Sequence, residues 1–334
     1  MPAAQPRPVR YAQIGTGHAH ASKLSVYLKS PEYEVVGLAE PDPELQDRAR
    51  QGIYADVPLM SVEQLLNIPG LQVVGVETEV RDLLPTAEKC IQAGKHIHLD
   101  KPAGESLPHY RRIMELASSR KLAVQMGYMY RYSPAVVLMR KFLDAGWLGE
   151  PFEVHTVMSK VVPTGGRRSL AEYPGGIMFE LGCHIIDLVI GVLGRPENIT
   201  AFHRQSGPQQ DSLRDNMLAV FEYPEALATV RSTALEVEGF ARRHFTVCGT
   251  EGTLHIQPLD RPAVRVAFSR GRGKYRKGYQ TIEFGSYPRY VGDAAELAAV
   301  ARGERELSFT PEHDLNVQEA VLLASGLPVE GEMP

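Results

Sequence analysis

The 334-residue chain has few cysteines and no long apolar run. Cys90, Cys183 and Cys248 lie far apart and form no C-x-x-C pair, zinc-finger spacing or disulfide framework, so we expect a reducing compartment, the cytoplasm. No apolar run is long enough to cross a bilayer, and the N-terminal segment lacks the apolar core of a signal peptide. We therefore expect no membrane association.

The chain also lacks a basic excess. Lysine and arginine total 36 against 40 acidic residues, giving a formal net charge of −4, which argues against nucleic acid as a partner. Charged residues make up 23% and hydrophobic residues 43% of the chain, as in ordinary globular proteins. At this length we expect two domains, each with its own core.

The N-terminal part alternates between strand-like and helix-like segments. Such alternation predicts an α/β fold with a parallel, doubly wound sheet. The expected strands are 9–15, 33–39, 71–77, 96–99 and 122–127, and the expected helices are 18–29, 43–51, a short one from Ser61, 82–93 and 106–119.

Beyond residue 127 the pattern changes to helices and then to consecutive hairpins. Expected helices are 134–145, 176–193, 289–302 and 311–325, and expected hairpins are 217–221/227–232, 245–248/253–256 and 264–268/281–284. Hairpins indicate a large, mostly antiparallel open sheet. We predict domains 1–127 and 128–334, with the C-terminal helix able to pack back on the first, and a ligand cleft between them.

The stretch Tyr11–Glu40 predicts a dinucleotide site. Gly15 allows a sharp turn after the first strand, Gly17 allows close approach of a pyrophosphate, and Glu40 stands where a carboxylate can accept from an adenosine ribose. The third glycine of G-x-G-x-x-G is replaced by His20. The alternative is an ordinary strand–helix turn that is glycine-rich for steric reasons.

Two further segments contain candidate catalytic groups. Lys101 follows a parallel strand, at the sheet edge where such sheets bind ligands, although it could be a surface lysine paired with Asp100. Glu180, His184 and Asp187 share one helix face, a pattern suited to proton transfer. That trio could instead be a satisfied histidine beside a core stripe, a solvated polar face, or a divalent metal site; we expect no metal.

Three tyrosines and Arg131 cluster in Gln125–Tyr132, where the chain leaves the first domain. They could line a cleft near a cofactor, or they could form an aromatic packing seam between domains. Loops such as Val161–Tyr173 are expected to set substrate specificity.

Taken in their order along the chain, these motifs resemble those of the Gfo/Idh/MocA oxidoreductase family, and the resemblance covers almost the whole chain. The matching segments are IGTGHAH near the start, AGKHIHLDKP at 93–102, VQMGYMYRYSP at 124–134, GGIMFELGCHIIDLV at 175–189 and a V-x-G-x-x-G-T hairpin at 247–253. The resemblance implies a Rossmann domain, a second domain whose sheet forms a homodimer or homotetramer, and NAD- or NADP-dependent oxidation of sugars, inositols or related polyols.

The resemblance also implies roles for individual residues. Lys101 matches the family's E-K-P lysine and His184 the histidine of its D-x-x-x-H pair, which makes these two the expected catalytic residues. The expected substrate-binding residues are Glu180, Asp187 and Tyr173. The expected cofactor-binding residues are Gly15, Thr16, Gly17, His18, Glu40, Thr78, Lys101 and Arg131.

The chain departs from the family pattern at several positions. Asp100 replaces the glutamate before Lys-Pro, Glu180 replaces the aspartate, and Val80 and Leu83 replace an asparagine and a histidine in the loop after the third strand. Glu40 would repel a 2′-phosphate and no arginine follows it, so NAD is favoured over NADP.

Three functions remain open from the sequence. We expect a dehydrogenase that transfers a hydride between NAD and the hydroxyl or carbonyl carbon of a sugar, inositol or polyol. One alternative is a redox-neutral enzyme of the same fold that uses bound NAD to cleave a glycoside or epimerise a sugar. The other is a regulator that binds NAD or a sugar without catalysis.

Overall fold

The computed structural model describes residues 7–330 and divides into two compact units. The first takes the chain up to Tyr128 together with Arg289–Leu315, and the second takes Met129–Pro288 together with Asn316–Glu330. The segment after residue 288 therefore belongs in part to the first unit and in part to the second.

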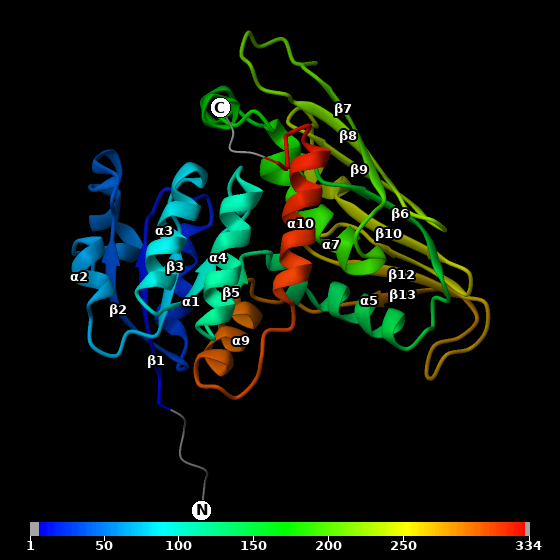
Figure 1. The fold of residues 1–334 in the computed structure, drawn as a ribbon. Coiled ribbons are helices and arrows are strands. Elements are labelled where there is room, and N and C mark those ends of the chain that lie inside the picture. Colours follow the sequence, from blue (N-terminus) through cyan, green and yellow to red (C-terminus); the bar gives the residue numbers. More distant parts are fainter. Residues whose placement is uncertain (1–6, 331–334) are drawn as a thin grey trace, which may run out of the picture. The chain divides into compact units, whose positions relative to one another are not determined.

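The first unit is built on the predicted parallel sheet. Its strands are β1 (Val9–Ile14), β2 (Tyr33–Ala39), β3 (Val73–Val76), β4 (His96–Leu99) and β5 (Val124–Met126). All neighbours pair in parallel in the order β2-β1-β3-β4-β5, which confirms the doubly wound α/β prediction (Figure 1). This order brings the carboxyl ends of β1, β3 and β4 next to one another.

The helices of the first unit are α1 (Leu24–Lys29), α2 (Val62–Leu66), α3 (Val80–Gln92), α4 (Leu107–Ser119) and α9 (Val291–Ala301). α3 and α4 lie side by side, and α2 begins at the predicted capping box of Ser61 and Gln64 (Figure 1). The predicted helix 18–29 is shorter than expected: a 3₁₀ turn (Ala21–Lys23) leads into α1, and the His18 N–H before it donates to the Glu77 carbonyl. The expected helix 43–51 is likewise replaced by 3₁₀ turns at Pro43–Leu45, Arg48–Arg50 and Gly52–Tyr54.

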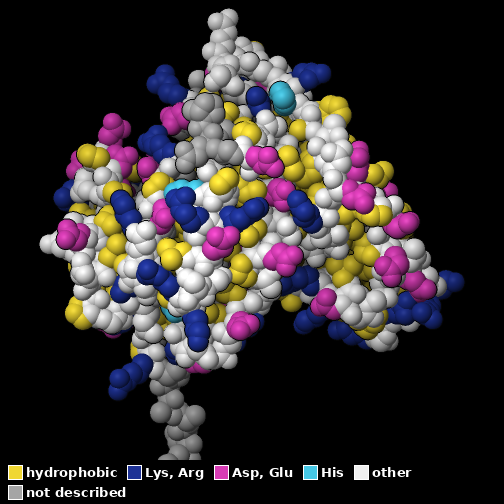
Figure 2. Space-filling view, viewed as in Figure 1, with side chains coloured by type: hydrophobic (Ala, Val, Ile, Leu, Met, Phe, Trp, Pro, Cys, Tyr) yellow, Lys and Arg dark blue, Asp and Glu magenta, His cyan; other side chains and the backbone are white. Residues whose placement is uncertain are grey.

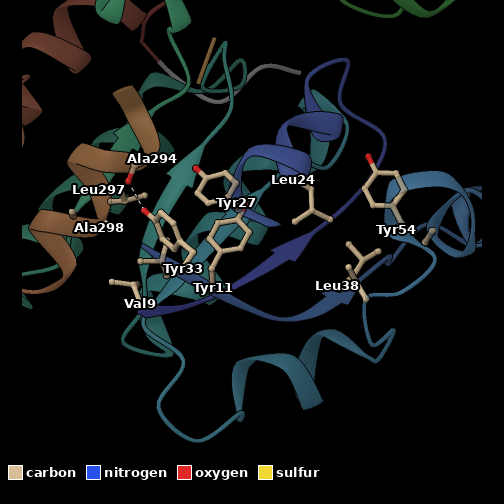
Figure 3. Close-up of a cluster of buried hydrophobic side chains, with 14 residues drawn as sticks. Val9, Tyr11, Leu24, Tyr27, Tyr33, Leu38, Tyr54, Ala294, Leu297 and Ala298 are labelled. Carbon is tan, nitrogen blue, oxygen red and sulfur yellow. Dashed lines mark hydrogen bonds between the residues drawn. The ribbon is translucent and has the colours of Figure 1, made fainter. Parts of the chain in front are cut away.

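An aromatic cluster explains why α9 belongs to this unit (Figure 3). Tyr11 of β1 stacks on Tyr27 of α1, with ring centroids 3.9 Å apart, and Tyr33 packs edge-on against both rings. The Tyr33 hydroxyl donates to the Ala294 carbonyl at 2.7 Å, and Leu297 joins the same core. A buried tyrosine hydroxyl thus obtains its hydrogen bond from a helix some 260 residues away in sequence.

The second unit contains an eight-stranded sheet in the order β13-β12-β11-β10-β6-β9-β8-β7 (Figure 1). The strands are β6 (Pro151–Val157), β7 (Asn198–Arg204), β8 (Asn216–Glu222), β9 (Leu227–Thr233), β10 (His244–Gly249), β11 (Gly252–Ile256), β12 (Ala263–Phe268) and β13 (Gly278–Glu283). The three predicted hairpins are confirmed. β6 was not expected; it pairs parallel with β9 and antiparallel with β10, so the sheet is mixed.

Helices of the second unit are α5 (Pro134–Asp144), α6 (Thr164–Ala171), α7 (Cys183–Leu193) and α8 (Gly239–Arg242), with 3₁₀ turn η5 at Met129–Tyr132; α10 (Pro311–Ala324) contributes its residues from Asn316. Two expectations need correction. Helix α6 occupies most of the expected loop Val161–Tyr173. The expected helix 176–193 begins with a π-helical turn, Met178–Gly182, a widened geometry that is frequent at functional sites.

Within the described residues, no helix has the length and apolar character needed to cross a membrane. On the face shown in Figure 2, basic and acidic side chains are interspersed, as the near-balanced composition leads one to expect.

Candidate active site

The glycine turn after β1 is shaped by its neighbour strand. Gly15 has φ +93°, and a Cβ there would lie 2.5 Å from the Thr78 nitrogen and 2.6 Å from the Glu77 carbonyl carbon. Both constraints require glycine, so Gly15 is fixed by the backbone following β3. The N–H groups of Gly17 and Ala19 make no hydrogen bond within residues 7–330, which leaves two donors for an anionic ligand.

Glu40, directly after β2, is joined to this turn. Its Oε2 accepts from both the N–H and the hydroxyl of Thr16, each at 2.6 Å, while Oε1 accepts from the Asp42 N–H at 3.0 Å. Because a carboxylate oxygen can accept two hydrogen bonds, Oε1 has room for one more donor, such as a ribose hydroxyl.

Glu40 also lines a cavity of about 240 Å³ in the first unit. The lining residues are Glu40, Pro41, Asp42, Leu45, Thr78, Glu79, Asp82, Pro85, Thr86 and Lys89. Four of these side chains are acidic and one is basic. The Thr78 hydroxyl is buried and has no hydrogen-bond partner in the described part of the chain. An uncompensated hydroxyl at a cavity wall, together with the two turn donors, fits an adenosine dinucleotide.

Lys101 follows β4 at the carboxyl edge of the same sheet. It is buried rather than on the surface, with 1% of its area exposed. Its N–H donates to Asp100 Oδ1 at 2.7 Å, and its carbonyl accepts from His18 Nε2 at 3.0 Å. The backbone of Lys101 is thus held on both sides, and His18 is tied to the lysine segment as well as to the glycine turn.

In the second unit, Arg131 and Asp187 are paired with each other. Arg131 Nη2 and Nε donate to Asp187 Oδ1 at 2.6 and 3.0 Å, and Nε also lies 3.1 Å from Oδ2. Both side chains are 2% exposed. This bidentate guanidinium–carboxylate pair joins η5 to α7. Arg131 was expected to contact the cofactor, and Asp187 was expected to contact the substrate.

His184 lies on the same face of α7 and is also buried. The edge of its ring meets Tyr130, with centroids 5.6 Å apart at 84°. Glu180 is on the π-helical turn, 3.8 Å from the Lys160 ammonium, and is partly exposed. Burial of His184 and Asp187 excludes a fully solvated polar face. Tyr173 lies in the short loop after α6, and its ring centroid is 6.1 Å from that of Phe179.

The sequence did not predict two buried charged residues beside Asp100. Lys23 reaches Asp100 Oδ2 at 2.7 Å and Glu77 Oε1 at 2.9 Å, and all three side chains are fully buried. His18 and His20 approach the same carboxylate at 3.0 and 3.2 Å. A sequence signal existed for Glu77, an acid at the end of an apolar strand, but Lys23 is indistinguishable from a surface lysine on a short helix.

Two family models match the chain. One, described as an oxidoreductase family with an NAD-binding Rossmann fold, matches residues 9–128, and the GFO/IDH/MocA C-terminal domain matches residues 136–255. Inositol 2-dehydrogenase 1 of Saccharopolyspora erythraea is 29% identical over 207 residues, 60% of this chain and 57% of the relative. Trans-1,2-dihydrobenzene-1,2-diol dehydrogenase of Bos taurus is 27% identical over 236 residues, 69% and 68% of the two chains.

A solved structure has the same fold over nearly its whole length. UDP-N-acetylglucosamine 3-dehydrogenase GnnA from Acidithiobacillus ferrooxidans superposes with a TM-score of 0.80 at 17% identity, covering 96% of this chain and 98% of the other. With both halves matched by models of one family and the fold shared, the chain belongs to the Gfo/Idh/MocA family of NAD-binding oxidoreductases.

Proposed function

We propose that the protein is an NAD-dependent dehydrogenase acting on a secondary alcohol with a neighbouring hydroxyl, in a sugar, inositol or related polyol. The observation that supports this most is Lys101: a buried lysine held at the end of β4, next to a glycine turn with two available N–H donors. The names of two relatives, an inositol dehydrogenase and a diol dehydrogenase, support the substrate class.

The cofactor would be held by the glycine turn, by Glu40 Oε1 on the ribose and by the Thr78 hydroxyl. When bound, it supplies a nicotinamide that exchanges a hydride with the substrate carbon. The excess of acidic side chains around the cavity favours NAD over NADP, because a 2′-phosphate would be repelled.

The chain's own residues would manage the proton and the oxygen. Lys101 donates a hydrogen bond to the substrate oxygen and stabilises its negative charge as the proton leaves. His184 takes that proton, and its buried ring is held edge-on by Tyr130. Glu180 binds a further hydroxyl, with Tyr173 near it, while Arg131 and Asp187 position η5 and α7.

Further elements of the proposal concern the assembly and the compartment. We propose a homodimer or homotetramer formed through the eight-stranded sheet, whose exposed Phe202 and Leu227 are available for burial, in the cytoplasm.

A two-stage experiment tests the function. Thermal stabilisation by NAD, NADP and a panel of sugars, inositols and vicinal diols identifies ligands, because binders raise apparent stability by mass action. NADH formation and product mass are then measured for the best candidates. We expect NAD to stabilise more than NADP, and Lys101→Met to lose at least 100-fold in kcat. Product without net NADH would point to the redox-neutral alternative, and NAD binding without any product would contradict the proposal.

A further inference from the structure

The ammonium of Lys23 lies in a fully enclosed polar site in the first unit. Its Nζ donates to Asp100 Oδ2 at 2.7 Å, and it lies 2.8 Å from His98 Nε2 and 2.9 Å from Glu77 Oε1. These three groups stand in β4 or directly after β3 and β4, at the carboxyl edge of the sheet.

Charge in this site is concentrated on Lys23 and Asp100. Burial would lower the pKa of Lys23, the charge of Asp100 opposes this most strongly, and the net shift of that pKa is upward. Burial favours the neutral acid at both carboxyls and raises the pKa of Glu77. At Asp100 that effect is overcome by His18, Lys23 and His20, which hold its pKa well below the usual range. Asp100 is therefore the ionised partner, and Glu77 is the neutral one.

His98 completes the site as a neutral ring. Burial and the neighbouring Lys23 lower its pKa to about 3. Its Nδ1 donates to Gln125 Oε1 at 3.1 Å, so Nε2 is left to accept from Lys23. The Gln125 side chain then donates to the Asp293 carbonyl, at the start of α9.

The opposite side of Asp100 faces Lys101. Oδ1 accepts the Lys101 N–H at 2.7 Å and lies 3.2 Å from His20 Nδ1. His18 Nδ1 lies 3.0 Å from Oδ2, and the other nitrogen of the same ring donates to the Lys101 carbonyl. One ionised carboxylate thus connects Lys23, two histidines of the glycine turn and the Lys101 backbone.

We propose that Lys23 is a positioning residue: it holds Asp100 in place, and Asp100 together with His18 fixes the backbone from which Lys101 acts. The shortened carboxylate at position 100 suits this arrangement, because its oxygens reach the adjacent Lys101 N–H and Lys23 at the same time. The catalytic importance of this positioning rests on the proposed function; the positioning itself does not.

Hydrogen–deuterium exchange of the unliganded protein tests the positioning directly, with the Lys101 amide resolved by fragmentation mass spectrometry. In Lys23→Met, Asp100 loses its cation, and we expect the Lys101 amide to exchange at least tenfold faster. The neighbouring amides of β4 should keep their protection, because they are held by the parallel ladder. Glu77→Gln is the matched control, since it removes a carboxyl that is already neutral, and it should leave the Lys101 amide within twofold of the wild type.

If Lys23→Met does not fold, Asp100→Asn provides the same measurement with the side-chain shape retained. An unchanged Lys101 amide in the variants would overturn the proposal, as would a uniform increase across the first unit, which indicates a merely structural role. An equal effect of Glu77→Gln would also overturn it.

If exchange responds as expected but no substrate is turned over, the proposed function fails and the positioning stands. If turnover depends on Lys101 but its amide does not respond in the variants, the positioning fails and the proposed function stands.

Discussion

The two units each contain a buried ion pair, and the two pairs are built differently. Arg131 pairs with Asp187 through a planar fork that joins two local elements of the second unit. Lys23 is a point charge shared among an ionised acid, a neutral acid and a neutral histidine at the sheet edge of the first unit. The fork fixes a geometry between two partners. The Lys23 ammonium instead connects groups at the ends of β3 and β4. The effect of removing it should therefore be distributed over several side chains.

The largest decrease in the free energy of unfolding is expected when the Arg131–Asp187 pair is broken. Arg131→Met leaves the buried Asp187 carboxyl without its bidentate donor, which should lower the free energy of unfolding by about 3–5 kcal/mol. Urea unfolding monitored by circular dichroism measures this. Arg131→Lys, which keeps the charge but loses the fork, is the control and should lose less. A loss below about 1 kcal/mol in Arg131→Met would mean that the pair is not buried as described.

A smaller decrease in the free energy of unfolding is expected for Lys23→Met. Asp100 keeps its two histidine neighbours, His18 and His20, when Lys23 is removed. We therefore expect a decrease of about 2–3 kcal/mol in the same urea experiment, below that of Arg131→Met. If Lys23→Met proves the more destabilising of the two, the remaining donors do not compensate and the contrast between fork and shared ammonium is wrong.

A pH experiment examines the neutral histidine of the shared site. The pKa of His98 is lowered by burial to about 3, so between pH 6.5 and 3 the unfolded chain binds a proton that the folded chain does not. Stability from His98 is thus complete above pH 6.5 and is lost as the pH falls. From pH 6.5 to 5 the loss is about 2 kcal/mol. His98→Gln should show a shallower decline, because other titrating groups cancel in the comparison; identical declines in both proteins would contradict this.

Much of this architecture was predictable from local pattern. The strand–helix alternation predicted the first sheet, the three hairpins predicted most of the second, and Gly15, Glu40 and Lys101 were found from their positions after strands. The prediction missed one strand of the second sheet. β6 was missed although Glu153 and His155 alternate with Val154 and Thr156 as in a half-buried strand, and its parallel partner β9 is about 70 residues away.

The positioning network was not predictable from the sequence. Lys23 lies one residue before α1 and its burial depends on Glu77 and Asp100, which are more than 50 residues away. The family resemblance assigned Arg131 to the cofactor and Asp187 to the substrate, and it gave no sign that the two side chains pair with each other. Charged residues whose partners are distant in sequence carry no local signature, and such pairing is where the three-dimensional structure adds most.

The smallest expected change in stability comes from Glu77→Gln, and it distinguishes the two acids around Lys23, Asp100 and Glu77. Burial raises the pKa of Glu77, so the folded protein holds a proton on it that the unfolded chain, with an ordinary value near 4.5, releases. The contribution of Glu77 is therefore complete below pH 4.5 and is lost as the pH rises. Glu77→Gln keeps a neutral acceptor and removes this loss. At pH 5 we expect the variant to lie within about 1 kcal/mol of the wild type, and its relative stability should increase from pH 5 to 8. A relative stability that falls over this range would place the negative charge on Glu77 as well, and Lys23 would then lie between two carboxylates.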